Sequence, residues 1–319
     1  MLLVEELKNI TTQGSYEDFL VFVNKMHGRE FEFLTDIAQI LLSFSQKITL
    51  PCDAIDICGT GGDNFTIKTT NISTISAFVL ASMGVKVAKH GGRAVSSSSG
   101  SLDFLSALGI LEIDPLISLE KFGICFLDAR KHHPSFKYLA PFRQRFGQKT
   151  IFNMLGPLLN PANISHQMVG ISFKNAVENY ANVVQNLGRK RLAVVQSKSE
   201  ADELLSFEDN TIIFVQNGKM RRVEVTPRNF GMPLTVDNSI IGGNSQENAQ
   251  NCLRFFENPI VNGIENTLFH TVCLNCAVAG KIFGVVDTIQ NGIALARTTL
   301  ATKKPLELLE SMRLCKKSF

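Results

Sequence analysis

The sequence has few cysteines, little net charge and no long apolar run. Its seven cysteines among 319 residues favour a reducing, cytoplasmic setting over a disulfide scaffold. Lys and Arg number 32 and Asp and Glu 29, and this near balance argues against a general binder of nucleic acid. The longest apolar stretch, residues 72–85, is broken by hydroxyl side chains and is too short to span a membrane. We therefore expect a cytoplasmic protein without nucleic-acid or membrane partners.

Other absences narrow the class of protein further. The opening segment MLLVEELKNI carries two acids and does not resemble a secretory signal. The chain has no low-complexity tract and no obvious repeat of 20–50 residues, as arrays of repeats have. Apolar residues make up 45% of the chain and charged residues 19%, which provides a sizeable core and excludes a disordered chain.

The hydrophobic periodicity predicts an α/β fold. Residues 1–48 carry apolar side chains at three-to-four spacing, as amphipathic helices do. Further along, strand-like and helix-like segments alternate, and this rhythm is typical of a largely parallel sheet. We expect strands at 54–58, 85–88, 123–127, 191–196 and 211–215. We expect helices at 73–83, 101–108 and 134–146 and around 288–298. Another helix is expected to begin after Asn244, with Glu247 as the partner of Asn244 in a capping box.

This order of elements predicts two domains. We expect a large α/β domain with a mostly parallel central sheet, formed by residues 51–130 and 161–319. We also expect a small all-helical domain that is discontinuous in sequence, formed by residues 1–50 and 131–160.

A glycine loop follows the first predicted strand. Gly59-Thr-Gly-Gly-Asp63 allows backbone N–H groups to converge on an anion without obstruction by Cβ atoms. Asn71, Ser73 and Thr74 then lie at the start of the next helix, where exposed N–H groups and the helix dipole favour phosphate. Alone, such a loop is more often a tight turn followed by a helix cap.

A second loop of similar character follows the next strand. Lys89-His-Gly-Gly-Arg93 and the serine-rich residues 96–101 lie at the carboxyl end of a predicted strand, the edge at which ligands bind in open α/β sheets. Two neighbouring phosphate-binding loops indicate a ligand with two separated phosphate groups. A flexible serine linker is the alternative, but apolar segments flank the loop on both sides.

Two adjacent carboxylates follow a later strand. Asp202 and Glu203 lie beyond the predicted strand 191–196, again on its carboxyl side. Such a pair can bind Mg²⁺ ions that also contact substrate phosphates, although alone it is usually a solvated surface feature.

Taken together, these motifs resemble the signature of the anthranilate phosphoribosyltransferases. The resemblance runs in order over roughly residues 54–310. The matching segments are Gly59–Asp63, Asn71–Thr74, Lys89–Ser97, Ser101, His133-Pro134, Pro141–Arg143, Thr150–Pro161, Asp202-Glu203, Gly242–Asn248 and Asn275–Gly280.

The resemblance implies a fold of the nucleoside-phosphorylase type and a glycosyltransferase activity. Such an enzyme transfers the phosphoribosyl group of 5-phosphoribosyl 1-pyrophosphate (PRPP) to anthranilate and releases pyrophosphate, a step of tryptophan biosynthesis. It implies Mg²⁺ as cofactor and a homodimer formed through the helical domain.

Site residues follow from the same resemblance. Arg143 is expected to face the anthranilate carboxylate, and the metal ligands are Ser73, Asp202 and Glu203. Arg143, Asp202 and Glu203 are therefore the expected catalytic residues. The residues expected to hold PRPP are Gly59, Gly62, Asp63, Thr69, Asn71, Ile72, Ser73, Thr74, Lys89, His90, Gly91, Gly92, Arg93, Ala94, Val95, Ser96, Ser97 and Ser101.

The chain departs from the family pattern at three places. Gly92 occupies the position at which the second loop of the family usually has asparagine, a side chain that lies near the acceptor. The segment between Asp63 and Asn71 is about two residues longer than usual and contains Lys68. The N-terminal helical region is shorter than usual.

Two other functions remain open from the sequence. One is a phosphoribosyltransferase or nucleoside phosphorylase of the same fold with a different acceptor, although Asp202-Glu203 and the run 150–161 speak against a nucleoside phosphorylase. A non-enzymatic relative that binds nucleic acid or a regulatory ligand is the other.

Several side chains have a structural and a functional interpretation. The Cys273-x-x-Cys276 spacing fits a buried helix face better than a zinc or redox site. The segment Arg189–Arg191 is interpreted as a solvated helix end. His133 is assigned a structural or acceptor-side role, and His90 an acid–base or a structural role.

Overall fold

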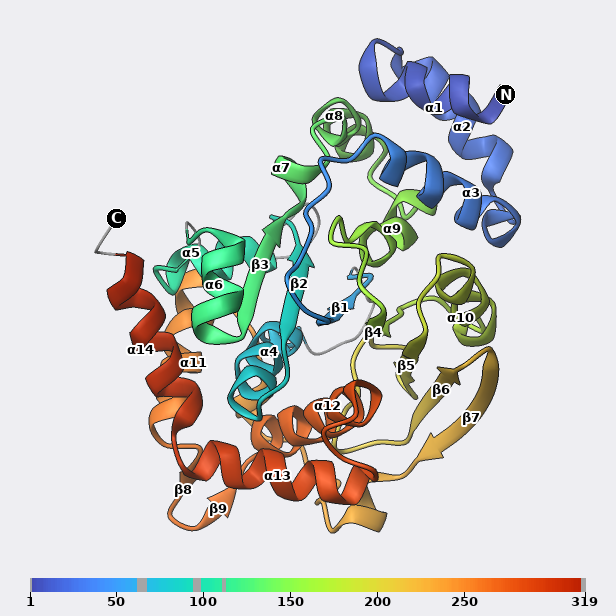
Figure 1. Ribbon diagram of the computed structural model, residues 1–319. Coiled ribbons are helices and arrows are strands. Elements are labelled where there is room, and N and C mark those ends of the chain that lie inside the picture. Colours follow the sequence, from blue (N-terminus) through green and yellow to red (C-terminus); the bar gives the residue numbers. More distant parts are fainter. Residues whose placement is uncertain (1, 62–67, 94–98, 111–112, 317–319) are drawn as a thin grey trace.

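A seven-stranded sheet forms the centre of the computed structural model, which describes residues 2–61, 68–93, 99–110 and 113–316. The strand order is β3-β2-β1-β4-β5-β6-β7 (Figure 1). Strands β1 to β5 are parallel, while β6 and β7 are antiparallel additions at one edge, so the expected mostly parallel sheet is confirmed. The strands are β1 Ile55–Gly59, β2 Val87–Gly91, β3 Ile124–Asp128, β4 His166–Gly170, β5 Arg191–Ser197, β6 Asn210–Gln216 and β7 Lys219–Val225.

The strand order contains one reversal of direction. From β1 the chain builds outward through β2 to β3, and then returns to the other side of β1 to form β4 and β5. The boundary between β1 and β4 is therefore a topological switch point, and ligands of open α/β sheets bind at the carboxyl ends of the strands at such a point. Every strand expected from the sequence is present, whereas β4 and β7 were not predicted.

Helices cover both faces of the sheet. Helices α4 (Ile72–Ser82) and α12 (Thr267–Phe283) pack on one face, and α10 (Val177–Asn186) packs on the other. Neighbouring strand residues alternate between these faces: Met168 packs with the α4 and α12 side chains, and Val169 with those of α10. Helix α12 is apolar on all sides and almost wholly buried, which confirms the interpretation of its two cysteines as core residues.

A helical part built from two segments stands above the sheet in Figure 1. It contains α1 (Leu2–Thr12), α2 (Tyr16–Met26), α3 (Glu30–Ser43), α8 (Phe136–Phe146) and α9 (Ile151–Leu155). Its core holds stacked aromatic rings such as Phe19 and Phe152, 5.9 Å apart. The same apolar cluster continues to Val169 and to Tyr180, whose hydroxyl donates to the carbonyl oxygen of Met154 at 2.6 Å. The division into two domains stays a prediction.

The remaining elements connect the strands or close the chain. Helix α11 begins after Asn244, whose side chain accepts from the N–H groups of Gln246 and Glu247, so the expected capping box is confirmed. No helix in the described ranges combines the length and apolar character needed to cross a membrane. These elements are α5 Ser101–Ala107, α6 Pro115–Phe122, α7 Ala129–His132, α11 Ser245–Glu257, α13 Ile289–Ala301, α14 Lys304–Lys316, η1 Gly156–Leu159, η2 Pro227–Phe230, η3 Asn238–Ile240, β8 Ile260–Val261 and β9 Ile264–Glu265.

The aromatic core of the helical part yields a stability prediction. Phe152 is buried and its ring contacts those of Phe19 and Phe22. Phe152→Ala should lower the free energy of unfolding by about 3–5 kcal/mol, because the substitution removes apolar contacts and leaves a cavity. Val261→Ala, at a residue with 52% exposure outside the helical part, is the control and should change it by less than about 0.5 kcal/mol. Urea denaturation measures both, and equal losses would contradict the assignment of this core.

Candidate active site

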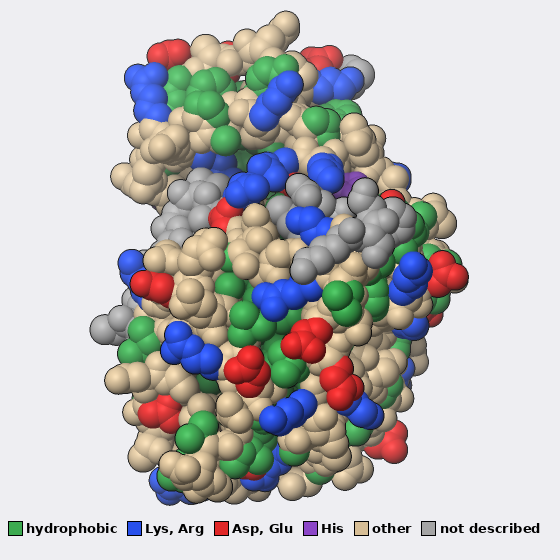
Figure 2. Space-filling model, turned by 90° about the vertical axis from the view of Figure 1, so that its left-hand side faces the viewer, with side chains coloured by type: hydrophobic (Ala, Val, Ile, Leu, Met, Phe, Trp, Pro, Cys, Tyr) green, Lys and Arg blue, Asp and Glu red, His purple; other side chains and the backbone are tan. Residues whose placement is uncertain are grey.

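The candidate site lies at the carboxyl edge of the sheet, where β1, β2 and β4 end at Gly59, Gly91 and Gly170. This edge faces the helical part. Figure 2 shows a waist between the smaller upper part and the larger lower part of the molecule, and Lys and Arg side chains gather along it.

Asp202 rests directly on the switch point of the sheet. Gly59 and Gly170 are paired in register at the ends of β1 and β4. A Cβ atom on Gly170 would lie 1.5 Å from the carbonyl oxygen of Asp202, and one on Gly59 would lie 2.0 Å from Asp202 Oδ2. The N–H group of Gly61 donates to the same Oδ2 at 2.7 Å. Only glycine at both strand ends allows the loop at Asp202 to approach this closely.

Glu203 binds the other end of the first glycine loop. The hydroxyl of Thr69 donates to Glu203 Oε2 at 3.0 Å. The adjacent carboxylates of Asp202 and Glu203 therefore hold the entry and the exit of the loop that begins at Gly61. Their hard oxygen atoms fit Mg²⁺, and no group of three or more His, Cys, Asp or Glu side chains suited to a metal occurs in the described part of the chain.

The amino terminus of α4 points its first residues at the same edge. The Asn71 side chain does not cap this helix, so the helix start keeps donors for an anion. Ser73 Oγ lies 3.1 Å from the Nζ atom of Lys89. The side chains of Ile72 and Thr74 are buried, and their N–H groups donate to the carbonyl oxygens of Thr70 at 2.7 Å and Asn71 at 3.0 Å.

Lys89 lies beneath the loops rather than in solvent. Its side chain is 3% exposed, and Nζ also donates to the carbonyl oxygen of Ile57 at 2.5 Å. Burial lowers the pKa of Lys89, and neighbouring acidic groups that include Asp56 oppose this shift. The ammonium group therefore joins β1 and β2 to the start of α4.

A buried polar network under the second loop was not predicted from the sequence. The Asp56 carboxylate accepts hydrogen bonds from the backbone N–H of His90 at 3.2 Å, from Asn160 Nδ2 at 3.0 Å and from Gln167 Nε2 at 3.4 Å. Arg189 Nε donates to the Gln167 amide oxygen at 3.3 Å. Burial raises the pKa of Asp56, and the charge of Lys89 opposes the shift. The signal in the sequence is a charged residue inside an apolar strand.

The interpretation of residues 189–191 as a solvated helix end is wrong for Arg189. This side chain is 3% exposed and lies in the network under the sheet edge. The sequence pattern shows a basic run, but it does not show that Gln167 and Asp56 on other strands offer partners to a buried guanidinium group.

His90 has a structural setting. Its ring lies 5.5 Å from that of His133, which stacks on Phe136 at 5.4 Å. Burial and then the neighbouring His133 lower the pKa of His90 to about 3, so the ring is neutral at physiological pH. Its Nε2 atom is buried without a hydrogen-bond partner among the described residues. A neutral, weakly basic ring is a poor general acid or base, so the geometry favours the structural role.

The second loop is packed against the start of α5. A Cβ atom on Gly91 would lie 2.1 Å from Ser101 Oγ, and that hydroxyl donates to the carbonyl oxygen of Gly92 at 3.4 Å. Arg93 forms an ion pair with Asp103 at 2.8 Å. Six of the expected PRPP-binding residues lie outside the described residues, namely Gly62, Asp63, Ala94, Val95, Ser96 and Ser97.

Arg143 lies on α8, seven residues and thus about two turns after Phe136. Phe136 is linked to the second loop through His133 and His90, so α8 begins beside this loop. The Arg143 guanidinium is half-buried, and burial lowers its pKa. Among the described residues, Arg143 has no ion-pair partner.

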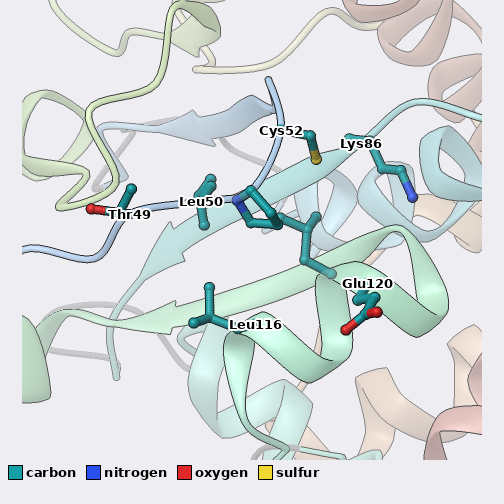
Figure 3. Close-up of a pocket in the computed structure, with 8 residues that line it drawn as sticks. Thr49, Leu50, Cys52, Lys86, Leu116 and Glu120 are labelled. Carbon is teal, nitrogen blue, oxygen red and sulfur yellow. The ribbon is translucent and has the colours of Figure 1, made fainter.

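A second hollow lies near the amino ends of β1 and β2. This cavity has a volume of about 560 Å³. Figure 3 shows the residues that line it. It contains none of the expected site residues and is not the candidate site. It is lined by Thr49, Leu50, Pro51, Cys52, Lys86, Leu116, Leu119 and Glu120.

The sequence and the fold match known proteins. The family model described as "Glycosyl transferase family, a/b domain" matches residues 52–305. Anthranilate phosphoribosyltransferase of Endomicrobium trichonymphae is 39% identical over 303 residues, which cover 94% of this chain and 88% of that protein. The enzyme of the same name from Streptococcus pneumoniae (strain Hungary19A-6) is 40% identical over 300 residues, which cover 92% of this chain and 87% of that protein.

Solved structures agree with these matches. Anthranilate phosphoribosyltransferase from Thermus thermophilus has a TM-score of 0.86 and 30% identity, with 98% of this chain and 93% of that chain covered. The Saccharomyces cerevisiae enzyme in complex with PRPP and Mg shares the fold, with a TM-score of 0.86, 23% identity, and 99% and 92% of the two chains covered.

The fold and the loops at its switch point thus define a transferase of the glycosyl transferase class. Within this class the chain belongs to the anthranilate phosphoribosyltransferase family, which confirms the resemblance noted in the sequence.

The low pKa of His90 predicts a pH dependence of stability. The ordinary pKa of histidine is 6.5 and that of folded His90 about 3, so between these values only the unfolded state takes up the proton. The free energy of unfolding should therefore fall as the pH drops below 6.5, by up to about 1.4 kcal/mol per pH unit from this residue. His90→Gln should flatten the acid slope in denaturant titrations, and His27→Gln at an exposed ring should not. An unchanged slope in His90→Gln would refute a buried, neutral His90.

Proposed function

We propose that the protein transfers the phosphoribosyl group of PRPP to anthranilate and releases pyrophosphate, as a step of tryptophan biosynthesis. The proposal rests on the close approach of Asp202 to Gly59 and Gly170 at the switch point of the sheet. Two adjacent carboxylates thereby hold both ends of a glycine loop beside the start of α4. Relatives with 39% and 40% identity carry the name of this activity.

Mg²⁺ is the proposed cofactor. Asp202 and Glu203, with the hydroxyl group of Ser73, would hold it, and these hard oxygen donors fit its preference. When bound with PRPP, the ion supplies positive charge that stabilises the negative charge developing on pyrophosphate.

In the proposed mechanism, the protein itself binds the two substrates and orients them for the reaction. The bond between C1 of the ribose and the pyrophosphate oxygen breaks, and its electron pair leaves with pyrophosphate. The anthranilate nitrogen forms the new bond to C1 from the opposite face, and its extra proton passes to solvent. Donors at the start of α4 would bind the phosphates. No general base is required, because an aromatic amine is neutral and nucleophilic at pH 7.

Arg143 is the proposed partner of the anthranilate carboxylate. A half-buried guanidinium attracts a carboxylate more strongly than one in bulk water does. The fixed position of the acceptor then brings its amine to the ribose carbon and lowers the entropic part of the barrier.

We also propose a cytoplasmic homodimer formed through the helical domain, residues 1–50 and 131–160, with PRPP bound by the α/β domain, residues 51–130 and 161–319. Leu2 and Val21, 66% and 68% exposed on α1 and α2, support an interface there. Sedimentation velocity with Val21→Glu tests the assembly.

The proposed activity and its metal site can be tested together. Loss of anthranilate fluorescence with PRPP and Mg²⁺ measures the transfer. Asp202→Asn with Glu203→Gln should lower turnover by about 100-fold or more, since the charge that holds the metal is removed. Asp209→Asn, at a more exposed carboxylate of the same region, is the control and should retain activity. Wild-type turnover in the double variant at saturating Mg²⁺ would disprove this metal site, and no transfer by the wild type would disprove the activity.

The glycine at position 92 predicts a weakened acceptor site. A Cβ atom there would meet its nearest described neighbour, Ala129 Cβ, at 3.9 Å, which is ordinary van der Waals contact. Gly92→Asn should lower the KM for anthranilate by about 10-fold or more, because one hydrogen bond to a charged group contributes roughly 1.5–3 kcal/mol. The KM for PRPP should change little. Gly92→Ala separates the effect of the amide from that of a stiffer loop, and equal kinetics of both variants would contradict the role of the amide.

A further inference from the structure

We infer that Asn248 is a positioning residue that orients the amide of Asn71 so that its N–H donors face the bound PRPP. The inference rests on the proposed function of the site. Asn248 lies in the first turn of α11, is 2% exposed, and is separated from Asn71 by 177 residues in the sequence. Its Nδ2 atom nevertheless donates to Asn71 Oδ1 at 3.0 Å.

The direction of this hydrogen bond is fixed by a backbone group. The N–H group of Gly243 donates to Asn248 Oδ1 at 2.7 Å, and a backbone N–H can only donate. The Nδ2 atom of Asn248 must therefore face Asn71, and Asn71 must accept this hydrogen bond with its amide oxygen. The orientation of the Asn248 amide thus determines the orientation of the Asn71 amide.

Ser99 holds the other side of Asn71 in the same orientation. Its hydroxyl donates to Asn71 Oδ1 at 3.2 Å, and its carbonyl oxygen accepts from Asn71 Nδ2 at 3.4 Å. Among the described residues, the amide oxygen of Asn71 accepts two hydrogen bonds, whereas Nδ2 has two hydrogens and makes one long bond. An anion at the start of α4 thus meets a donor instead of a repelling oxygen.

The start of α11 is anchored to the first glycine loop by backbone contacts. The N–H group of Gly242 donates to the carbonyl oxygen of Lys68 at 2.7 Å, and that of Thr70 donates to the carbonyl oxygen of Ile240 at 2.9 Å. A Cβ atom on Gly242 would lie 2.4 Å from the carbonyl oxygen of Thr69. These contacts therefore hold Asn248 at a fixed distance from Asn71, which follows the first glycine loop.

Asn248→Asp tests the orientation directly. The carboxylate still accepts from Gly243 N–H but cannot donate to Asn71, which is then free to turn its oxygen toward the phosphates. We expect the KM for PRPP, and its Kd in titration calorimetry, to rise by about 10-fold or more, with the KM for anthranilate within about twofold. Asn248→Ala removes the donor without adding charge and should act in the same direction. Gln250→Glu, an exposed site on the same helix, adds the same charge and should behave as the wild type.

A double-mutant cycle separates orientation from the added charge. If Asn248 acts through Asn71, the effect of Asn248→Asp should largely disappear in an Asn71→Ala background, because the group to be oriented is gone. Retention of the full effect in that background overturns the inference.

Failure of the inference and failure of the proposed function are distinguishable. Normal transfer by the wild type with unchanged PRPP constants in both Asn248 variants overturns the inference and leaves the function intact. PRPP binding without transfer to anthranilate overturns the function, while the calorimetric comparison still decides the role of Asn248. Absence of PRPP binding by the wild type overturns both.

Discussion

The buried carboxylate of Asp56 is the group on which the arrangement of the sheet edge depends. It lies on β1 in the middle of the sheet and accepts hydrogen bonds from β2 through His90 N–H, from β4 through Gln167, and from Asn160 in the connection that leaves the helical part. A carboxylate in such a place is tolerated only when it is hydrogen-bonded and charge-compensated, because its desolvation costs several kcal/mol. With Lys89 nearby, these requirements fix β2, β4 and the connection that contains Asn160 around the Asp56 carboxylate.

The same constraint carries through to the candidate active site. Lys89, held below by the carbonyl oxygen of Ile57, reaches Ser73 at the start of α4. Above it, the loop at Asp202 lies against strand ends that have no Cβ atoms. The groups that would bind phosphate and metal are therefore fixed by the sheet before a ligand arrives. A polar site held in this way stabilises developing charge without reorganising its dipoles during the reaction.

Local patterns in the sequence predicted the loops of this site but not their supports. The glycine run after β1, the capping box of α11 and the end of the helix predicted at 73–83 are each determined by neighbouring residues, so each could be predicted directly. Asp56 and Arg189 are different, because their role depends on partners contributed by other strands. Strand β7 was missed because its residues are mostly charged and exposed at the sheet edge, where no apolar alternation is needed.

The near-neutral composition is compatible with a strongly anionic ligand because few of the described site groups need to be free cations. Lys89 is turned inward, and Arg93 is paired with Asp103. In the proposed site, the start of α4 would bind PRPP through neutral donors, whose effect depends on the direction in which they point. A charge attracts an anion from any direction, but an amide attracts it only with its N–H side. A site built from such groups needs side chains that set orientation, and this is why a residue as distant in sequence as Asn248 belongs to its chemistry.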